Sequence, residues 1–156
     1  MSYTAVANRP IQPPTAVWDD HERWFKIASR FKLSCMSNTK WRKVFTAIAE
    51  SPVEVRRCEL KCIDSDYVAV QGRAPQVREL MERRFTDSIW QPFEYKWIEW
   101  FRFPRQFKPY PGVGLVVTQD VEALRAVIPE ATQACLELDD KYLWLFGYRD
   151  DPAPEA

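Results

Sequence analysis

The most constraining feature of the sequence is a run of large aromatic residues over positions 93–103 that alternate with other residue types. Successive side chains of a β-strand point to opposite faces, so this period of two predicts a strand. One face of the predicted strand carries Phe93, Tyr95, Trp97, Phe101 and Phe103. The other face carries Glu94, Lys96, Ile98, Trp100 and Arg102. A soluble chain must cover the ring face, either with its own helices or with a ligand that stacks on rings.

Both uses of the ring face are open at this point. Such a face is typical of a sheet packed under helices, but rings can also form a platform for single-stranded nucleic acid. The cations available to follow phosphates would be Lys96, Arg102, Arg105 and Lys108. However, 22 Lys and Arg balance 22 Asp and Glu, so the chain lacks the basic excess that sequence-independent binding uses. We therefore expect the rings to be core, with the nucleic-acid platform as the alternative.

Helical and strand patterns mix irregularly along the rest of the chain. Apolar residues at helical spacing predict helices over 17–33, 39–50, 75–85 and 119–128, the last with Thr118 as its N-cap. Strands are predicted over 53–63, with a bulge near Arg56, and over 67–70, 93–103, 134–138 and 142–148. This order lacks the regular alternation of a parallel sheet. It predicts an α+β fold, with a largely antiparallel sheet and helices packed mainly on one face.

The domain organisation follows from length and composition. With 156 residues, 46% of them hydrophobic, the chain has the size and core material of one domain. Prolines predict a flexible N-terminal arm over 1–15, followed by a single α+β domain over 16–149 and a loose acidic tail over 150–156. We find no secretory signal pattern and no stretch of the roughly 18 apolar residues that a membrane helix needs. The sequence predicts a cytoplasmic protein without a membrane partner.

Residues suited to catalysis or metal binding are few. There is one histidine, His21, and the four glycines fit neither a phosphate loop nor a dinucleotide fingerprint. On a strand, Cys58 and Cys62 would lie about 13 Å apart, too far for a bridge or a shared metal. We expect free thiols, no metal, no cofactor and no enzyme activity. The remaining catalytic alternative is a hydrolase that uses a carboxylate pair such as Asp64 with Asp66.

Glu99 interrupts the ring face between Trp97 and Phe101. A buried carboxylate must be paired or hydrogen-bonded. If Glu99 is buried, we expect a structural polar lock in which Lys40 or Arg149 is its partner. If the strand bulges at this position, Glu99 faces water instead.

Several residues are predicted contacts for another protein. Trp90 and Trp100 fall outside the predicted apolar stripes, and exposed tryptophans are frequent interface anchors. Acidic and aromatic residues of two loops would suit a basic cleft: Asp64, Asp66, Tyr67 and Asp87. A net charge of zero also weakens colloidal repulsion, which favours a standing partner or a homodimer.

Three short motifs carry a family resemblance. Residues 37–42 (Ser-Asn-Thr-Lys-Trp-Arg) open a predicted helix, 98–100 (Ile-Glu-Trp) lie within the aromatic strand, and 146–149 (Phe-Gly-Tyr-Arg) end the domain. In this order they resemble a family of small bacterial proteins that have an Asn-Thr-Lys-Trp helix start and end in Tyr-Gly-Tyr-Arg. In this chain Phe146 stands where the family has the first of these tyrosines. Proteins of this kind are similar to the immunity partners of polymorphic toxins.

The resemblance implies a non-catalytic protein-binding module, namely an immunity-type inhibitor that neutralises a bacterial toxin domain by direct binding. The alternative from the residues themselves is an accessory protein that binds single-stranded nucleic acid through the aromatic strand.

Overall fold

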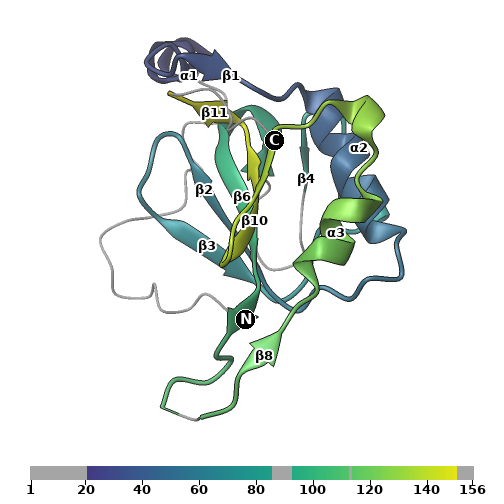
Figure 1. Cartoon of the computed structure of the whole chain (residues 1–156). Coiled ribbons are helices and arrows are strands. Elements are labelled where there is room, and N and C mark those ends of the chain that lie inside the picture. The colour runs from purple at the N-terminus through teal and green to yellow at the C-terminus, as the bar shows by residue number, and fades with distance from the viewer. Residues whose placement is uncertain (1–20, 86–92, 113, 151–156) are drawn as a thin grey trace.

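A five-stranded antiparallel sheet forms the centre of the structure, a computed structural model that describes residues 21–85, 93–112 and 114–150 (Figure 1). The strands run in the order β3-β2-β6-β10-β9. Their bounds are β2 (Cys58–Cys62), β3 (Val68–Gln71), β6 (Ile98–Pro104), β9 (Leu136–Leu138) and β10 (Tyr142–Phe146). Each neighbouring pair is antiparallel. The predicted α+β class is therefore confirmed.

Helices α2 (Asn38–Ala49) and α3 (Val121–Val127) lie on one side of this sheet, and α1 (His21–Ala28) lies beyond its end (Figure 1). Short strands form three additional pairs: β1 (Leu33–Ser34) with β11 (Tyr148–Arg149), β4 (Arg84–Phe85) with β5 (Phe93–Glu94), and β7 (Gln106–Phe107) with β8 (Val117–Thr118). Single 3-10 turns are η2 (Val77–Glu79), η3 (Tyr95–Trp97) and η4 (Glu130–Thr132). Within the described ranges, no helix has the length and apolar character needed to cross a membrane.

The hydrophobic core lies between the sheet and its helices. Tyr95, Trp97, Phe101 and Phe103 are each 0% exposed, which confirms that these rings of the aromatic stretch are core. From α2, the ring of Phe45 meets Phe101 edge-on, with centroids 4.9 Å apart. One connected cluster of buried side chains includes residues of α2, α3, β2, β3, β6 and β10. The predicted arm (1–15) and residues 151–156 of the predicted tail lie outside the described residues.

The aromatic stretch is not the single strand that its alternation predicts. It divides into β5, η3 and β6, and the turn of η3 changes the phase so that Trp97 and Ile98 are both buried. In the pairing with β2, Lys61 is opposite Trp100 but Cys62 is opposite Ile98. Glu99 is thus the extra residue of a β-bulge. The predicted bulge near Arg56 is wrong, because the irregularity falls at Glu99.

Two predicted helices are shorter than their patterns suggest. α1 ends at Ala28, and Leu33 lies in β1 because its backbone pairs with Arg149. Positions 75–85 form only the turn η2 and the strand β4. Here Glu79 accepts two hydrogen bonds from the guanidinium of Arg73, at 2.7 and 2.6 Å, which stabilise a single turn. Contacts with a residue outside the segment thus override the helical spacing.

Other boundaries also shift. β2 begins at Cys58 rather than at position 53. The N-cap of α3 is Asp120, whose carboxylate accepts from Ala123 N at 3.0 Å, and Thr118 belongs to β8 instead. The predicted second helix, the short strand beside β2 and the hairpin of β9 with β10 are confirmed.

Gly147 joins β10 to β11 where the backbone passes close to β6. Its N–H donates to Glu99 O and its carbonyl accepts from Cys35 N, both at 2.8 Å. A Cβ atom here would lie 2.1 Å from Ile98 O and 3.3 Å from Trp41 Cζ2. Any side chain at this position must push β6 or α2 away.

We expect Gly147→Ala to lower the free energy of unfolding by roughly 3 kcal/mol, because overpacking forces backbone shifts. Urea denaturation measures this change. Gly114→Ala is the matched control, since a Cβ at Gly114 meets nothing within 4 Å. Equal stabilities of the two variants would contradict the close approach of Gly147 to β6.

Candidate functional site

The sheet face that points away from the core carries a layer of rings and arginines, which we call the aromatic–arginine face. Its members are Trp100 and Arg102 of β6, Tyr142, Trp144 and Phe146 of β10, and Arg149 of β11. Trp100 pairs across the sheet with Phe146, and Arg102 pairs with Trp144, so their side chains share one face. All members of the face are half-buried.

The rings of this face are in mutual contact. Trp144 stacks on Phe146 with centroids 5.5 Å apart and an interplanar angle of 7°. Trp100 meets Trp144 edge-on at 5.3 Å. The guanidinium of Arg102 lies 4.4 Å from the ring centroid of Trp100 and 4.1 Å from that of Tyr142. Cation–π attraction therefore holds this arginine among the rings.

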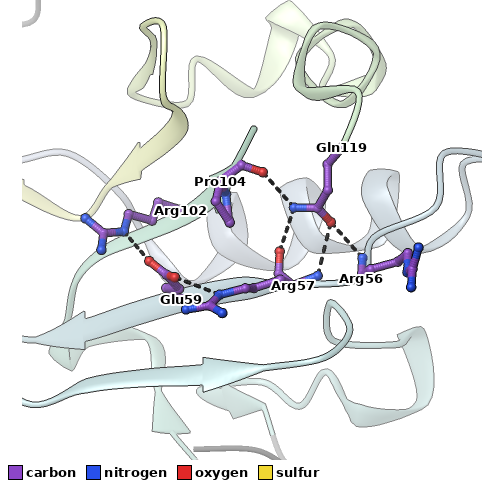
Figure 2. Close-up of polar contacts among 6 residues, drawn as sticks. All are labelled: Arg56, Arg57, Glu59, Arg102, Pro104 and Gln119. Carbon is purple, nitrogen blue, oxygen red and sulfur yellow. Dashed lines mark hydrogen bonds and ion pairs between the residues drawn. The ribbon is translucent and has the colours of Figure 1, made fainter. Parts of the chain in front are cut away.

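Glu59 of β2 ties two arginines to the sheet, as Figure 2 shows. Its Oε1 accepts from Nε of Arg102 at 2.6 Å, and its Oε2 accepts from Nε of Arg57 at 2.9 Å. Glu59 is only 5% exposed, so its carboxylate needs this pairing to be buried. Arg57 also lies over the ring of Phe107, at 5.4 Å from its centroid. The bonds of Glu59 fix where both guanidinium groups lie.

The other charges near the face are paired in the same way. Lys61 Nζ lies 2.5 Å from Oε1 of Glu99, and Arg149 Nη2 lies 3.2 Å from Oε1 of Glu137. Arg149 also covers the ring of Phe146, at 4.0 Å from its centroid. Cations and carboxylates thus alternate over the face.

Gln119 clamps the start of β2 to the end of β6 (Figure 2). Its Oε1 accepts from the backbone N–H groups of Arg56 and Arg57, at 2.7 and 3.1 Å. Its Nε2 donates to the carbonyls of Arg57 and Pro104, at 3.0 and 2.8 Å. The residue is 4% exposed, so these backbone groups have little access to water. These bonds fix the backbone of Arg57, whose side chain pairs with Glu59. Glu59 in turn lies opposite Arg102 of the aromatic–arginine face.

The residues predicted for partner contact lie in different environments. Trp100 belongs to the aromatic–arginine face, on the side opposite to Trp97, as its sequence position predicts. Asp87 and Trp90 lie outside the described residues. Tyr67 is 6% exposed and packs in the core cluster, so the prediction that it offers a surface contact is wrong. Its ring is turned inward at the start of β3.

Asp64 and Asp66 lie in the turn between β2 and β3. Asp66 is exposed, whereas Asp64 is half-buried and its Oδ1 has no hydrogen-bond partner. Burial raises the pKa of Asp64, while the charges of Arg23 and Lys61 oppose this effect. An unsatisfied carboxylate oxygen of this kind is a local cost to stability.

The predicted polar lock has a different partner. Because the bulge turns Glu99 away from the core, it pairs with Lys61 of the neighbouring strand. Lys40 instead donates to Gln133 O at 3.2 Å, and Arg149 pairs with Glu137. Of the two alternatives predicted for Glu99, the bulge is confirmed, whereas the polar lock with Lys40 or Arg149 is wrong.

Sequence reasoning missed the rings of β10 as surface residues. Tyr142, Trp144 and Phe146 alternate with the buried Leu143 and Leu145, a period of two that is visible in the sequence. The alternation predicts the hairpin but does not indicate which strand adjoins its outer side. The position of Trp100 beside these rings follows from the pairing of β10 with β6, which only the tertiary structure provides.

Two other carboxylates, Asp139 and Glu94, have structural hydrogen bonds. Asp139 accepts from the N–H groups of Lys141 and Tyr142, at 2.8 and 2.7 Å, and from Nε1 of Trp144, at 2.9 Å. Glu94 accepts from Nε1 of Trp97 at 3.2 Å. Over the ranges that the structure covers, no cluster of three or more His, Cys, Asp or Glu could hold a metal ion.

The fold and this face define a small α+β protein whose most distinctive surface is a layer of rings and paired charges. The chain belongs to DUF6678, a family of unknown function, whose model matches residues 25–151. No curated protein and no solved structure matches the chain.

We expect Gln119→Ala to lower the free energy of unfolding by roughly 3 kcal/mol, because it leaves several poorly hydrated backbone groups unpaired. Urea denaturation measures the change. Gln106→Ala, at an exposed position of β7, is the control and should cost about 0.5 kcal/mol or less. If Gln119→Ala left the free energy of unfolding unchanged, the hydrogen bonds of Gln119 would not be what holds β2 and β6 together.

We expect Asp64→Asn to stabilise the protein at neutral pH. Burial raises the pKa of Asp64 above its ordinary value of 3.8, so the ionised carboxylate disfavours the folded state once the pH exceeds that value. The gain should therefore vanish on acidification below pH 3.8, where the carboxyl is protonated in both states. Thermal melts at several pH values test this, with the exposed Asp66→Asn as control. A gain that persists in acid would exclude ionisation as its cause.

Proposed function

We propose that this protein is a non-catalytic protein-binding module that neutralises a bacterial toxin by direct binding, as an immunity protein does. The observation that supports this proposal is the aromatic–arginine face, which leaves Trp100, Trp144 and Tyr142 half-buried beside two arginines. Trp, Tyr and Arg are the residue types that most often dominate binding energy at protein interfaces. A partner that covers this face would complete the burial of its rings.

The rigidity of the face also favours binding. Arg102 is held by Glu59 and by the rings of Trp100 and Tyr142, so it has little rotamer freedom left to lose. Side chains that are already ordered reduce the entropy cost of association. An inhibitor that acts by occupying a site benefits from such pre-organisation.

The charges suit a protein partner. The basic side chains of Arg57, Lys61, Arg102 and Arg149 are each paired with a carboxylate. Beyond β2, the exposed Asp66 and the desolvated Asp64 would fit a basic cleft, since a cationic partner would compensate the poor solvation of Asp64. The three motifs that carry the resemblance to small bacterial proteins fall within residues 25–151, the region that the family model matches. We also propose a cytoplasmic location, in which free thiols are the usual state.

A second candidate is binding of single-stranded nucleic acid. Four rings of the predicted platform are buried, namely Tyr95, Trp97, Phe101 and Phe103, so bases would have to stack on the parallel pair Trp144 and Phe146 instead. The pairing of nearby cations with carboxylates leaves little free positive charge for phosphates. We therefore favour the protein partner.

We expect the protein to form a complex with the product of the adjacent gene and to protect cells against its toxicity. Trp100→Ala and Trp144→Ala should each weaken the complex at least tenfold, because each removes a large ring from the centre of the face. Calorimetric titration measures affinity, and circular dichroism confirms folding. Tyr110→Ala is the matched control, since Tyr110 is an aromatic residue with 62% exposure in the β7–β8 connection.

The outcomes separate the candidates. Absence of both a complex and protection would exclude the immunity function for this gene pair. Salt-sensitive binding of single-stranded oligonucleotides that is lost in the same tryptophan variants would favour nucleic acid. A dimer that the tryptophan variants dissociate would identify a second copy of the chain as the occupant of the face.

A further inference from the structure

Two cysteines that are far apart in the sequence meet beside the junction of β10 and β11. Cys35 follows β1, and its N–H donates to Gly147 O at 2.8 Å. Cys135 precedes β9, and its carbonyl accepts from Phe146 N at 3.0 Å. Because Phe146 and Gly147 are consecutive, these bonds bring Cys35 and Cys135 to adjoining positions.

The two thiol groups are in contact. Cys135 Sγ lies 3.9 Å from Cys35 O, and the Cys135 thiol is close enough to influence the ionisation of Cys35. A disulfide requires sulfur atoms that can meet and backbones whose Cα atoms lie about 4.4–6.8 Å apart. The backbone bonds to consecutive residues and the 3.9 Å from Cys135 Sγ to Cys35 O place the two side chains beside each other. The pair therefore needs little movement to be bridged.

Exposure distinguishes this pair from the other thiols. Cys35 and Cys135 are both half-buried, which lets a small reagent reach them. Cys58 and Cys62 are only 1% and 2% exposed, and Cys58 donates to Arg73 O. The chain thus contains one accessible pair and two enclosed thiols that serve as internal references.

We propose that Cys35 and Cys135 are a site of reversible oxidation, which forms an intramolecular disulfide by exchange with a low-molecular-weight disulfide such as oxidised glutathione. This inference does not depend on the proposed immunity function. It assigns to the pair a modification that links β1 to the start of β9.

The exchange occurs in two balanced steps. Burial and the neighbouring Cys135 thiol raise the pKa of Cys35 to about 12, so we assign the second step of the exchange to Cys35. In the first step, the sulfur of Cys135 forms a bond with one sulfur of glutathione disulfide, whose S–S bond breaks, and the first glutathione leaves with the proton of Cys135. The Cys35 sulfur then attacks Cys135 Sγ, and the second glutathione leaves with the proton of Cys35. The protein is oxidised by two electrons and one glutathione disulfide is reduced to two thiols.

The bridge should also stabilise the fold. It joins residues separated by 100 positions, and closing a long loop restricts the unfolded chain. Oxidised protein should therefore melt at a higher temperature than reduced protein. The shift should be absent in a variant that lacks either cysteine.

The experiment equilibrates the full chain in buffers of reduced and oxidised glutathione, blocks free thiols by alkylation and measures intact mass and peptide maps. We expect the loss of two hydrogen atoms, a linked peptide pair that contains Cys35 and Cys135, and reversal by excess reduced glutathione. Cys58 and Cys62 should be alkylated only after unfolding. The variants Cys35→Ser and Cys135→Ser should not lose two hydrogen atoms.

Three results would overturn the proposal. They are an unchanged mass in oxidised glutathione, a stable glutathione adduct without an internal bridge, and a bridge that involves Cys58 or Cys62. Peptide mapping uses the unaltered chain, so the result does not depend on whether a serine variant folds.

Discussion

Burial of one face of β6 is the interaction on which the rest of the structure depends. β6 is the central strand, paired on one side with β2 and on the other with β10. Its rings Phe101 and Phe103 are fully buried, and Phe45 of α2 packs edge-on against Phe101. Because successive strand residues point to opposite faces, burying these rings directs Trp100 and Arg102 outward. The binding face that we propose is therefore a geometric consequence of the core.

The charges on the outer face are paired with one another. Glu59 is enclosed by two arginines, and Glu99 and Glu137 each hold one cation. These carboxylates orient the neighbouring cationic side chains. The rings supply area for contact. An interface favours this combination of ordered rings and balanced charge, because little entropy or solvation is lost on association.

Hydrogen bonding of buried polar groups differs between parts of the structure. It is complete around Gln119 but incomplete at Asp64, which belongs to the proposed partner-binding residues. Gln119 satisfies four backbone groups at the junction of β2, β6 and α3. Asp64, in the turn between β2 and β3, has one carboxylate oxygen without a hydrogen-bond partner, and burial raises its pKa. The Cys35–Cys135 contact lies at another junction, where β1 and β9 approach the end of β10. Polar groups in the centre of the sheet are thus hydrogen-bonded, whereas the unpaired oxygen of Asp64 and the two neighbouring thiols lie near the ends of strands.

The sequence by itself determined the features that depend on local spacing: the helix opened by Ser37, the hairpin of β9 and β10, and the inward rings of the aromatic stretch. Only the tertiary structure decided the bulge at Glu99, the failure of the helix predicted over 75–85, and the meeting of Cys35 with Cys135. Each of these depends on a partner distant in sequence, such as Lys61 for Glu99. Periodicity reports which side of an element is apolar, but strand register and long-range pairing determine which side chains meet.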